Sequence, residues 1–587
     1  MQSHATLQGR GFRSLQPMLL FLAVAIALLI ADGFNGSTMQ DVDDVARRLQ
    51  IADLLKDGEW YDLTWPYIAM PEAYVSPWSR LVDFPYVAIT RLLEPLVGQD
   101  RAFDAARFTV PLLWLVAYAW LAARLIHEIL DEHPTLLQTG VAALASLFAI
   151  IEFIPYRIDH HNVQIVLLLA ACLGLVSRHR FAGVLLGLSI FLSVAVGLET
   201  LPYLIIGLTG VSVHAALAPQ SNMPRKLLLT GLTLLIATLP LGFLLTGSTL
   251  AQTQCDTLAA PLASALMAGG LVAFGGPALW SVASLNTPWI RLSILVVGGA
   301  IALFAIWVSF PACHGGPYHM INETAHTYWL SNVIQEKGPI ASFARGEQML
   351  TLIFLAIVAM TLCGWMSVRT SRPEIVLVLV IATLGTLMTA WQMRNFKFPA
   401  ALLPLFVPLF IRMTSQTGNL RPLLTALAVP IICLGAMFAF VKPEGRALTL
   451  IDLMEGDTCK SADLTVFEPL PSSRILAPVG LSVTLAEHFQ ATGAPHTIAA
   501  MPFHRASDGM EKIFRTFVLT DADLRREALA PFDYVAVCTL PDTEADADLA
   551  PLFSALSSGD DWPGLSDVQD TPTSRLRLLE IDHDTVE

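Results

Sequence analysis

The strongest constraint on the fold of this chain is a series of long apolar runs. A helix needs about 20 mainly apolar residues to cross the hydrocarbon core of a bilayer. Thirteen runs meet or approach this length, and they lie near residues 17–31, 108–128, 136–154, 163–177, 181–197, 200–218, 226–246, 259–283, 290–310, 348–368, 374–392, 398–412 and 422–441. No convincing small-residue cleavage site follows the first run, so we expect a retained span rather than a signal peptide. The sequence predicts an all-α polytopic membrane bundle of about 13 transmembrane helices.

The amino-acid composition agrees with a membrane protein, and the charge distribution predicts a separate acidic domain after the transmembrane domain of residues 1–441. Hydrophobic residues make up 54% of the 587 residues and charged residues only 14%, whereas soluble globular chains carry about 25% charged residues. The formal charge of -14 arises in residues 442–587, which hold 11 Lys and Arg against 25 Asp and Glu. This balance argues against nucleic-acid binding. Strand-like pieces such as Tyr534–Cys538 predict that the tail is a small α/β domain.

Basic residues in short loops predict the orientation of the bundle. With a cytoplasmic N-terminus, the inner loops carry Arg178, Arg180, Arg225, Lys226, Arg291, Arg369, Arg372, Arg412 and Arg421. An odd number of spans then places residues 442–587 outside. We expect a bacterial inner-membrane protein with a periplasmic C-terminal domain. The loops 32–107 and 311–347 and the turn 155–162 fall on the same side.

Disulfides are allowed on this outer side, where the four cysteines that lie outside the apolar runs are expected. Cys255 with Cys313 and Cys459 with Cys538 are plausible pairs, although the sequence alone does not fix the connectivity.

Carboxylates and imidazoles occur in two of the outer segments. Asp41-Val-Asp43-Asp44 follows the first span, either as a solvated helix start or as ligands for a hard divalent cation. Asp159-His160-His161 lies in the second outer turn and offers mixed oxygen and nitrogen ligands, with at most one imidazole expected to coordinate. The alternative for this turn is a polar loop satisfied by water.

Two further outer segments supply an acid and two cations. Glu336 precedes the tenth span and, taken alone, is an ordinary surface acid. Arg394 and Lys397 lie on an outer turn, where cations suit a phosphate or pyrophosphate group. Because acids, imidazole and Arg from distant loops are expected on one face of the bundle, they predict a metal-assisted site that acts on a lipid-linked phosphate.

These segments resemble the motifs of oligosaccharyltransferase catalytic subunits of archaeal and bacterial type. The stretch from Asp44 to Leu55 resembles the first-loop motif, and Asp159-His160-His161 resembles the second motif, which reads Asp-His-His in archaeal members. Ile334-Gln335-Glu336 is similar to the short motif ending in Glu in the fifth outer loop, and Arg394 to the outer-face Arg near the eleventh and twelfth spans. The resemblance implies a GT-C-like fold and a polyprenyl-linked sugar donor.

The chain departs from the family pattern in two places. Gln50 stands where the first motif usually has Arg. The tail also lacks the Trp-Trp-Asp element with which true oligosaccharyltransferases read the glycosylation sequon, and its nearest string is Asp560-Asp561-Trp562-Pro563. Asparagine as the acceptor is therefore in doubt.

The resemblance implies a role for each candidate residue. Asp44, Asp159 and His161 would hold a divalent cation, Mg²⁺ or Mn²⁺. Arg394 and Lys397 would bind the donor phosphate, and Glu336 with Asp44 would position or deprotonate a periplasmic or envelope acceptor. We further expect loop 311–347 to act as a lid.

Two alternatives stay open at this point. One is transfer of a monosaccharide from polyprenyl phosphate to lipid A, a surface polysaccharide or a protein hydroxyl. The other is a transporter or flippase of a lipid-linked substrate, which is disfavoured because the ionisable residues cluster at outer ends and no repeat is visible.

Overall fold

The structure is a computed structural model that divides into two compact units. It describes residues 2–34, 41–56, 58–70, 72–280, 282, 285–369, 372–419, 421–442, 454, 459, 462–540, 550–568 and 575–586, with side chains from 15 to 31 in the first helix. Unit 1 comprises Met1–Gln40, Trp78–His314 and Lys337–Pro443. Unit 2 comprises Asp41–Pro77, Gly315–Glu336 and Glu444–Glu587.

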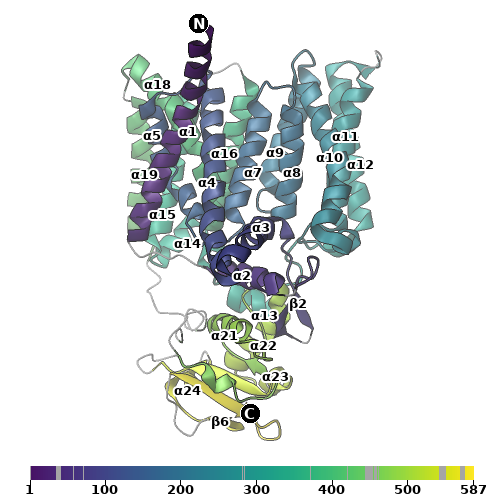
Figure 1. Cartoon of the computed structure of the whole chain (residues 1–587), viewed down its shortest axis with the longest axis vertical. Coiled ribbons are helices and arrows are strands. Elements are labelled where there is room, and N and C mark those ends of the chain that lie inside the picture. The colour runs from purple at the N-terminus through teal and green to yellow at the C-terminus, as the bar shows by residue number, and fades with distance from the viewer. Residues whose placement is uncertain are drawn as a thin grey trace. The chain divides into compact units, whose positions relative to one another are not determined.

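Unit 1 is helical, and its long helices run side by side (Figure 1). Its helices are α1 (Gln2–Phe34), α3 (Arg80–Val97), α4 (Gln99–Leu130), α5 (Leu136–Ala145), α6 (Leu147–Ile150), α7 (His161–Val176), α8 (Ala182–Val196), α9 (Leu201–Leu217), α10 (Met223–Thr246), α11 (Ala260–Leu279), α12 (Pro288–Ser309), α14 (Pro339–Ala344), α15 (Gln348–Ser367), α16 (Pro373–Trp391), α17 (Lys397–Leu402), α18 (Val407–Thr417) and α19 (Arg421–Phe440). Short helical turns are η1 (Ile151–Phe153), η2 (Gly247–Ala251), η4 (Pro311–Cys313), η7 (Met393–Phe396) and η8 (Leu403–Phe406).

Where the structure describes the predicted apolar runs, each lies largely in helical segments, but not all of these helices are long enough to span a bilayer by themselves. Among the described residues, eight helices are long and apolar enough, or nine if the bent pair Leu136–Ala145 and Leu147–Phe153 is one span. Four shorter apolar helices are Leu15–Ala31, α7, α8 and α9. A helix such as α7, with 16 residues, is about 24 Å long, less than the hydrocarbon core of about 30 Å. The chain is a multi-pass helical membrane protein, and the count of 13 spans stays a prediction.

The bend between α5 and α6 has a local cause at Ser146. The two helical segments meet at an angle of 60°. The Ser146 hydroxyl donates to the carbonyl oxygen of Ala142 at 2.9 Å, and its backbone N–H is shared between Ala142 and Ala143. A side-chain bond back to the preceding turn bends helices. One apolar run in the sequence therefore becomes two helical pieces.

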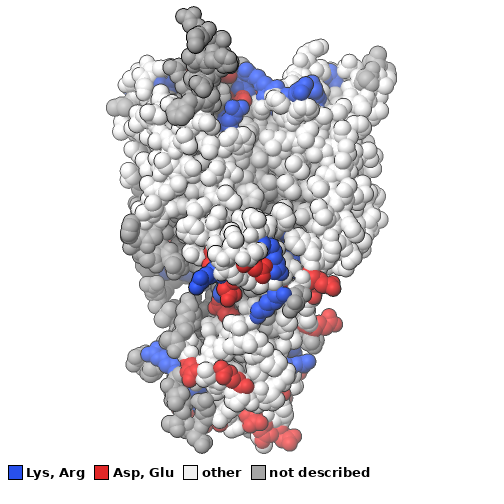
Figure 2. Space-filling view, viewed as in Figure 1, with Lys and Arg blue, Asp and Glu red and all other residues white. Residues whose placement is uncertain are grey.

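Cations close the carboxyl ends of α4 and α7 at the end of unit 1 away from residue 161. Arg372 donates to the carbonyl oxygens of Glu128 and Val176 at 2.9 and 2.7 Å. Lys226 and Arg412 donate to other carbonyls of the same two helix ends. Cations are favoured there because the last carbonyls lack helical partners and carry the negative end of the helix dipole. Lys and Arg gather at the upper end of the helices in Figure 2.

Replacing Arg372 with alanine is expected to destabilise unit 1 by about 3 kcal/mol, because the carbonyl and carboxylate groups that pair with this mostly buried charge would lose their donor. Its side chain is 11% exposed and also pairs with Glu374 at 3.0 Å. Thermal denaturation of the purified protein in detergent measures the effect. Arg369→Ala is the control, since this nearby arginine is exposed. The Arg369→Ala protein should have the melting temperature of wild type. A melting temperature of Arg372→Ala equal to that of the control would contradict the capping role.

Unit 2 contains a mixed sheet of order β2-β1-β4-β3-β5-β7-β6. The inner strands β1, β4, β3 and β5 are parallel, with Ile475 opposite Ile498 and Tyr534, while β2, β6 and β7 pair antiparallel. The strands are β1 (Thr64–Ala69), β2 (Ala73–Val75), β3 (Arg474–Leu476), β4 (Thr497–Ile498), β5 (Tyr534–Cys538), β6 (Leu565–Asp567) and β7 (Leu576–Ile581). The helices and turns are α2 (Val42–Lys56), α13 (Glu323–Ala325), η5 (His326–Leu330), η6 (Ile334–Glu336), η9 (Thr465–Phe467), α21 (Val479–Thr492), η10 (His504–Ala506), α22 (Ser507–Phe517), α23 (Ala522–Leu529) and α24 (Pro551–Ser558).

Two segments that were expected to belong to a domain of residues 1–441 lie in unit 2. They are Asp41–Pro77 and Gly315–Glu336. Strand β1 extends the sheet through the parallel pair of Ile68 and Ile498. Helix α2 contacts α21 through Lys56, which donates to the carbonyl of Gln490 at 2.8 Å. Asn322 donates twice to Ser507, from its backbone at 2.8 Å and its amide at 3.1 Å. The sheet therefore needs residues 41–77 as well as the tail, and the expected boundaries differ from the observed units.

Candidate functional site

The turn that carries Asp159 is shaped by an uncommon backbone conformation. Tyr156 has a φ of +72°, a left-handed value that is rare for bulky residues. Its N–H donates to the carbonyl of Arg107 at 3.0 Å, and the Arg107 guanidinium lies 5.2 Å from the centre of its ring. These contacts fix the chain reversal in front of α7. Asp159 therefore lies at the start of α7, where the helix dipole favours a carboxylate.

Asp159, His160 and His161 are buried together, and Asp159 is only 1% exposed. One ligand atom from each can be chosen so that all lie within 4.8 Å of one another. Oδ2 of Asp159 is 3.3 Å from Nε2 of His161. Ligand atoms that share one ion at about 2.0–2.1 Å lie about 3 Å apart. The donor set and its spacing therefore fit a divalent cation.

His160 has a different set of partners from His161. Its Nδ1 lies 2.6 Å from Oδ1 of Asp159, and its Nε2 lies 3.3 Å from Oε1 of Glu199. Both ring nitrogens of His160 therefore face carboxylates, and the contact of Nε2 with Glu199 has hydrogen-bond geometry. This arrangement leaves His161 as the imidazole ligand, as expected from the sequence.

Glu199 joins this turn to Arg394. It lies between α8 and α9, and its Oε2 accepts a 2.5 Å hydrogen bond from Nε2 of Gln164. Its Oε1 lies 3.8 Å from Nη2 of Arg394. Glu199 is not among the site residues predicted from the sequence. A single acid in a short turn between two apolar runs carries no pattern, and only the folded arrangement gives it these partners.

The charges in the cluster stabilise one another despite their burial. Burial alone would raise the pKa of Glu199, but the hydrogen bond and charge of His160 and the charge of Arg394 lower it well below the usual value. Burial would lower the pKa of His160, yet the carboxylates of Asp159 and Glu199 raise it to about 10. At neutral pH this side of the cluster is an ionic network of two carboxylates and an imidazolium.

The two predicted phosphate cations have unequal surroundings. Arg394 lies in η7 with its side chain 27% exposed. Lys397 begins α17 and is 4% exposed, and its charge interacts with those of Glu152 and His161. Arg394 is therefore the more accessible cation, whereas Lys397 lies deeper beside the Asp-His-His turn.

Asp44 lies in unit 2, in the first turn of α2. Its Oδ2 accepts the backbone N–H of Asp41 at 3.2 Å, and Oδ1 of Asp41 accepts the N–H of Asp44 at 3.0 Å. This reciprocal pair caps the start of the helix. The carboxylate of Asp44 therefore has a structural partner in addition to the predicted role as a ligand.

Glu336 also lies in unit 2, at the end of η6 and half-buried. The segment before it is held by Asn322 and by Tyr328, whose ring stacks on Phe514 at 5.7 Å. Gly316 near its start has a φ of +80°, a conformation that favours glycine. The movement expected of a lid stays a prediction.

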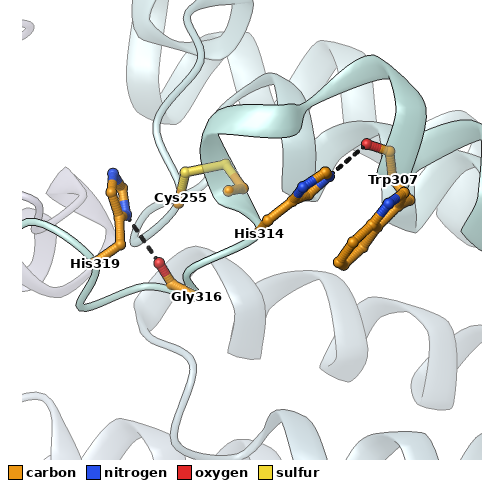
Figure 3. The surroundings of a disulfide bond; sticks show 6 residues. Cys255, Trp307, His314, Gly316 and His319 are labelled. Atoms are coloured by element: carbon orange, nitrogen blue, oxygen red, sulfur yellow. Dashed lines mark hydrogen bonds between the residues drawn. A yellow bond between two sulfur atoms is a disulfide. The ribbon is translucent and has the colours of Figure 1, made fainter.

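Both expected cysteine pairs form disulfides in the structure. Cys255 and Cys313 join the segment before α11 to η4, with their Cα atoms 5.4 Å apart (Figure 3). Beside this bond, His314 stacks on Trp307 at 3.6 Å and bonds to its carbonyl oxygen. Cys459 and Cys538 join two parts of unit 2. The structure therefore ties loop 311–347 to unit 1 at its first residues.

The structure thus brings together some of the predicted site residues in unit 1 and places the others in unit 2. Asp159, His161 and Lys397 form one cluster in unit 1, and Glu199 links it to Arg394. Asp44 and Glu336 belong to unit 2.

The comparisons with known proteins concern the fold. No family model and no curated protein sequence matches this chain. The fold is similar to archaeal oligosaccharyltransferase AglB from Archaeoglobus fulgidus in complex with an inhibitory peptide and a dolichol-phosphate, with a TM-score of 0.61 and 12% identity over 96% of this chain and 74% of that one. It is also similar to the oligosaccharyltransferase of that organism with Zn and sulfate (TM-score 0.57, 13% identity, 95% and 72% covered).

A third similar structure is the same archaeal enzyme tethered to an acceptor peptide with the NVT sequon (TM-score 0.57, 12% identity, 97% and 74% covered). The expected fold is confirmed, because the likeness extends over nearly the whole chain. The chain has an oligosaccharyltransferase-like fold.

Proposed function

We propose that this oligosaccharyltransferase-like chain is a GT-C glycosyltransferase that moves a sugar or oligosaccharide from a polyprenyl-(pyro)phosphate donor to an extracytoplasmic acceptor. The observation that carries the proposal is the group of Asp159, His161, Glu199 and Arg394 in unit 1, in which the first two side chains are buried and the last two are partly exposed. It combines oxygen and nitrogen ligands with a guanidinium, a set suited to a phosphate leaving group. The archaeal structures with dolichol-phosphate, Zn and acceptor peptide support this chemistry.

Each candidate residue has a role in this proposal. Asp44, Asp159 and His161 would hold Mg²⁺ or Mn²⁺, and the ion would supply positive charge to neutralise the departing (pyro)phosphate. Arg394 and Lys397 donate hydrogen bonds to the same phosphate. Glu336, with Asp44, positions the acceptor or removes its proton. The protein acts in a bacterial inner membrane, with its tail in the periplasm.

A second candidate changes the donor and acceptor but keeps the fold. The tail lacks the Trp-Trp-Asp sequon reader, and the ring of Trp562 in its nearest string is covered by the Arg525 guanidinium at 4.9 Å. This favours transfer of a monosaccharide from polyprenyl phosphate to lipid A, a surface polysaccharide or a protein hydroxyl.

Removal of divalent cations from the purified protein tests the proposal and separates the candidates. We expect EDTA to abolish consumption of a polyprenyl-pyrophosphate-linked oligosaccharide and added Mg²⁺ or Mn²⁺ to restore it. Activity on polyprenyl-phosphate monosaccharide that EDTA does not affect would instead favour the second candidate. Glycan profiles of envelope proteins and lipids from cells with and without the gene then identify the acceptor. Movement of the lipid-linked sugar across proteoliposomes without transfer would reject both.

A further inference from the structure

The Gln164 side chain connects Glu199 to His161. Its Nε2 donates to Oε2 of Glu199 at 2.5 Å, and its Oε1 lies 3.0 Å from Nδ1 of His161. Gln164 is fully buried and Glu199 half-buried, so water has little access to compete for these bonds. The two bonds form a continuous path from the carboxylate to the imidazole.

The donor and acceptor roles along this path are fixed by Glu199. Its carboxylate faces the His160 ring at 3.3 Å and the Arg394 guanidinium at 3.8 Å, and this pairing favours the ionised carboxylate, which can only accept. The Gln164 amide must therefore point its NH₂ at Glu199, which leaves its oxygen facing His161. An oxygen can only accept, so Nδ1 of His161 carries the proton.

The protonated Nδ1 determines what the other ring nitrogen of His161 can do. In the neutral imidazole, Nε2 then has a lone pair, and it lies 3.3 Å from Oδ2 of Asp159. Two electron-pair donors at this distance repel each other, and a metal ion bound between them would remove the repulsion. The tautomer set by Gln164 is the one that a metal ligand requires.

We infer that Glu199 is the positioning residue of the site: through Gln164 it fixes the His161 tautomer that binds the cation, and through His160 it holds the Asp159 turn. Glu199 also lies 3.8 Å from Arg394, so one carboxylate orients both the cation ligands and the phosphate-binding guanidinium. This inference rests on the proposed function.

Gly197 provides a steric test of the same path. A Cβ atom at this position would lie 2.5 Å from Oε2 of Glu199 and 2.7 Å from Nε2 of Gln164. Its φ of 173° is extended backbone that alanine adopts without strain. The atoms in the way are the ends of two flexible side chains. Gly197→Ala should therefore separate Glu199 from Gln164 while the backbone stays in place.

The test is binding of Mn²⁺ alone to the metal-free, full-length protein in detergent, followed by electron paramagnetic resonance. We expect Glu199→Gln and Gly197→Ala each to weaken Mn²⁺ affinity by about 10- to 100-fold, the usual effect of losing an outer-shell partner. Glu132→Gln is the matched control, because this acid is 56% exposed and pairs with Arg412 just after the carboxyl end of α4. It should bind Mn²⁺ like wild type.

An exchange of the two side chains separates positioning from a loss of packing. In the double variant Q164E/E199Q, the carboxylate at position 164 can accept from both His161 and the new amide. We expect it to recover most of the Mn²⁺ affinity that Glu199→Gln loses.

Wild-type affinity in folded Glu199→Gln and Gly197→Ala would overturn the inference, and so would a double variant no better than Glu199→Gln. A wild-type protein that binds no Mn²⁺ would overturn the proposed metal site itself. Melting temperatures of all variants establish that they are folded.

Discussion

Sugar transfer by Asp159→Asn is expected to fall by about 100- to 1000-fold, because the charge that should hold the cation at the leaving phosphate is lost. The amide has nearly the same size as the carboxylate, so the buried turn keeps its packing. Initial rates with lipid-linked donor, at equal protein amounts in the same membranes, measure the effect. The loss should appear in the maximal rate and persist at saturating donor.

Asp131→Asn is the matched control for this variant. Asp131 follows α4 with a left-handed φ of 58° that asparagine also adopts, and its side chain is 70% exposed. It should transfer sugar at the wild-type rate. Wild-type activity in Asp159→Asn would remove Asp159 from the proposed site.

Asp44→Ala is expected to lose nearly all transfer and also about 1 kcal/mol of stability, because the residue both caps α2 and serves as a proposed ligand. Asp44→Asn separates the two roles. Its amide oxygen can still accept the N–H of Asp41, whereas its negative charge is gone. We therefore expect Asp44→Asn to melt like wild type but to transfer sugar as poorly as Asp44→Ala.

The same two measurements, melting and initial rate, decide the outcome. If Asp44→Asn keeps full activity, Asp44 acts only as a helix cap. Asp43→Asn should then be tested next, since Asp43 is the neighbouring acid in the same turn of α2.

The helical bundle of unit 1 could be predicted from the sequence because each of its helices is encoded by a continuous apolar run. The length and apolar composition of each run are enough to predict a membrane-spanning helix, and the runs overlap with helices such as α4 and α15. The Asp159-His160-His161 turn could also be found, since three adjacent polar residues between two apolar runs must have partners. The span count was harder, because Ser146 bends one run and α7 is short.

Glu199 and Gln164 could not be predicted as parts of the site. Gln164 reads as one polar residue within an apolar run, and Glu199 as an acid at a span end. Their roles depend on bonds between residues 35 to 39 positions apart in the sequence. The packing of α7 against α8 and α9 creates these bonds, and no local pattern encodes it.

The composition of unit 2 was missed for a related reason. The pairing of β1 with β4 joins Ile68 to Ile498 across most of the chain, and a strand as short as β4 has no clear alternation. The acidic tail could be recognised as an α/β domain from segments such as Tyr534–Cys538. Its partners in residues 41–77 could not.

Unit 2 is built from segments far apart in the sequence, and we expect this to determine when it can fold during synthesis. Strand β1 and helix α2 emerge early in synthesis, but their partners β4 and α21 emerge only after the helices of unit 1 have been made. Contacts this distant in sequence form late, since a long loop must first be closed. Until then β1 has an open edge that invites pairing with other chains. Asp44, carried by α2, therefore reaches its folded position only when residues 444–587 have been made, so we expect a ribosome-bound or truncated chain to have an incomplete unit 2 and to lack the proposed site.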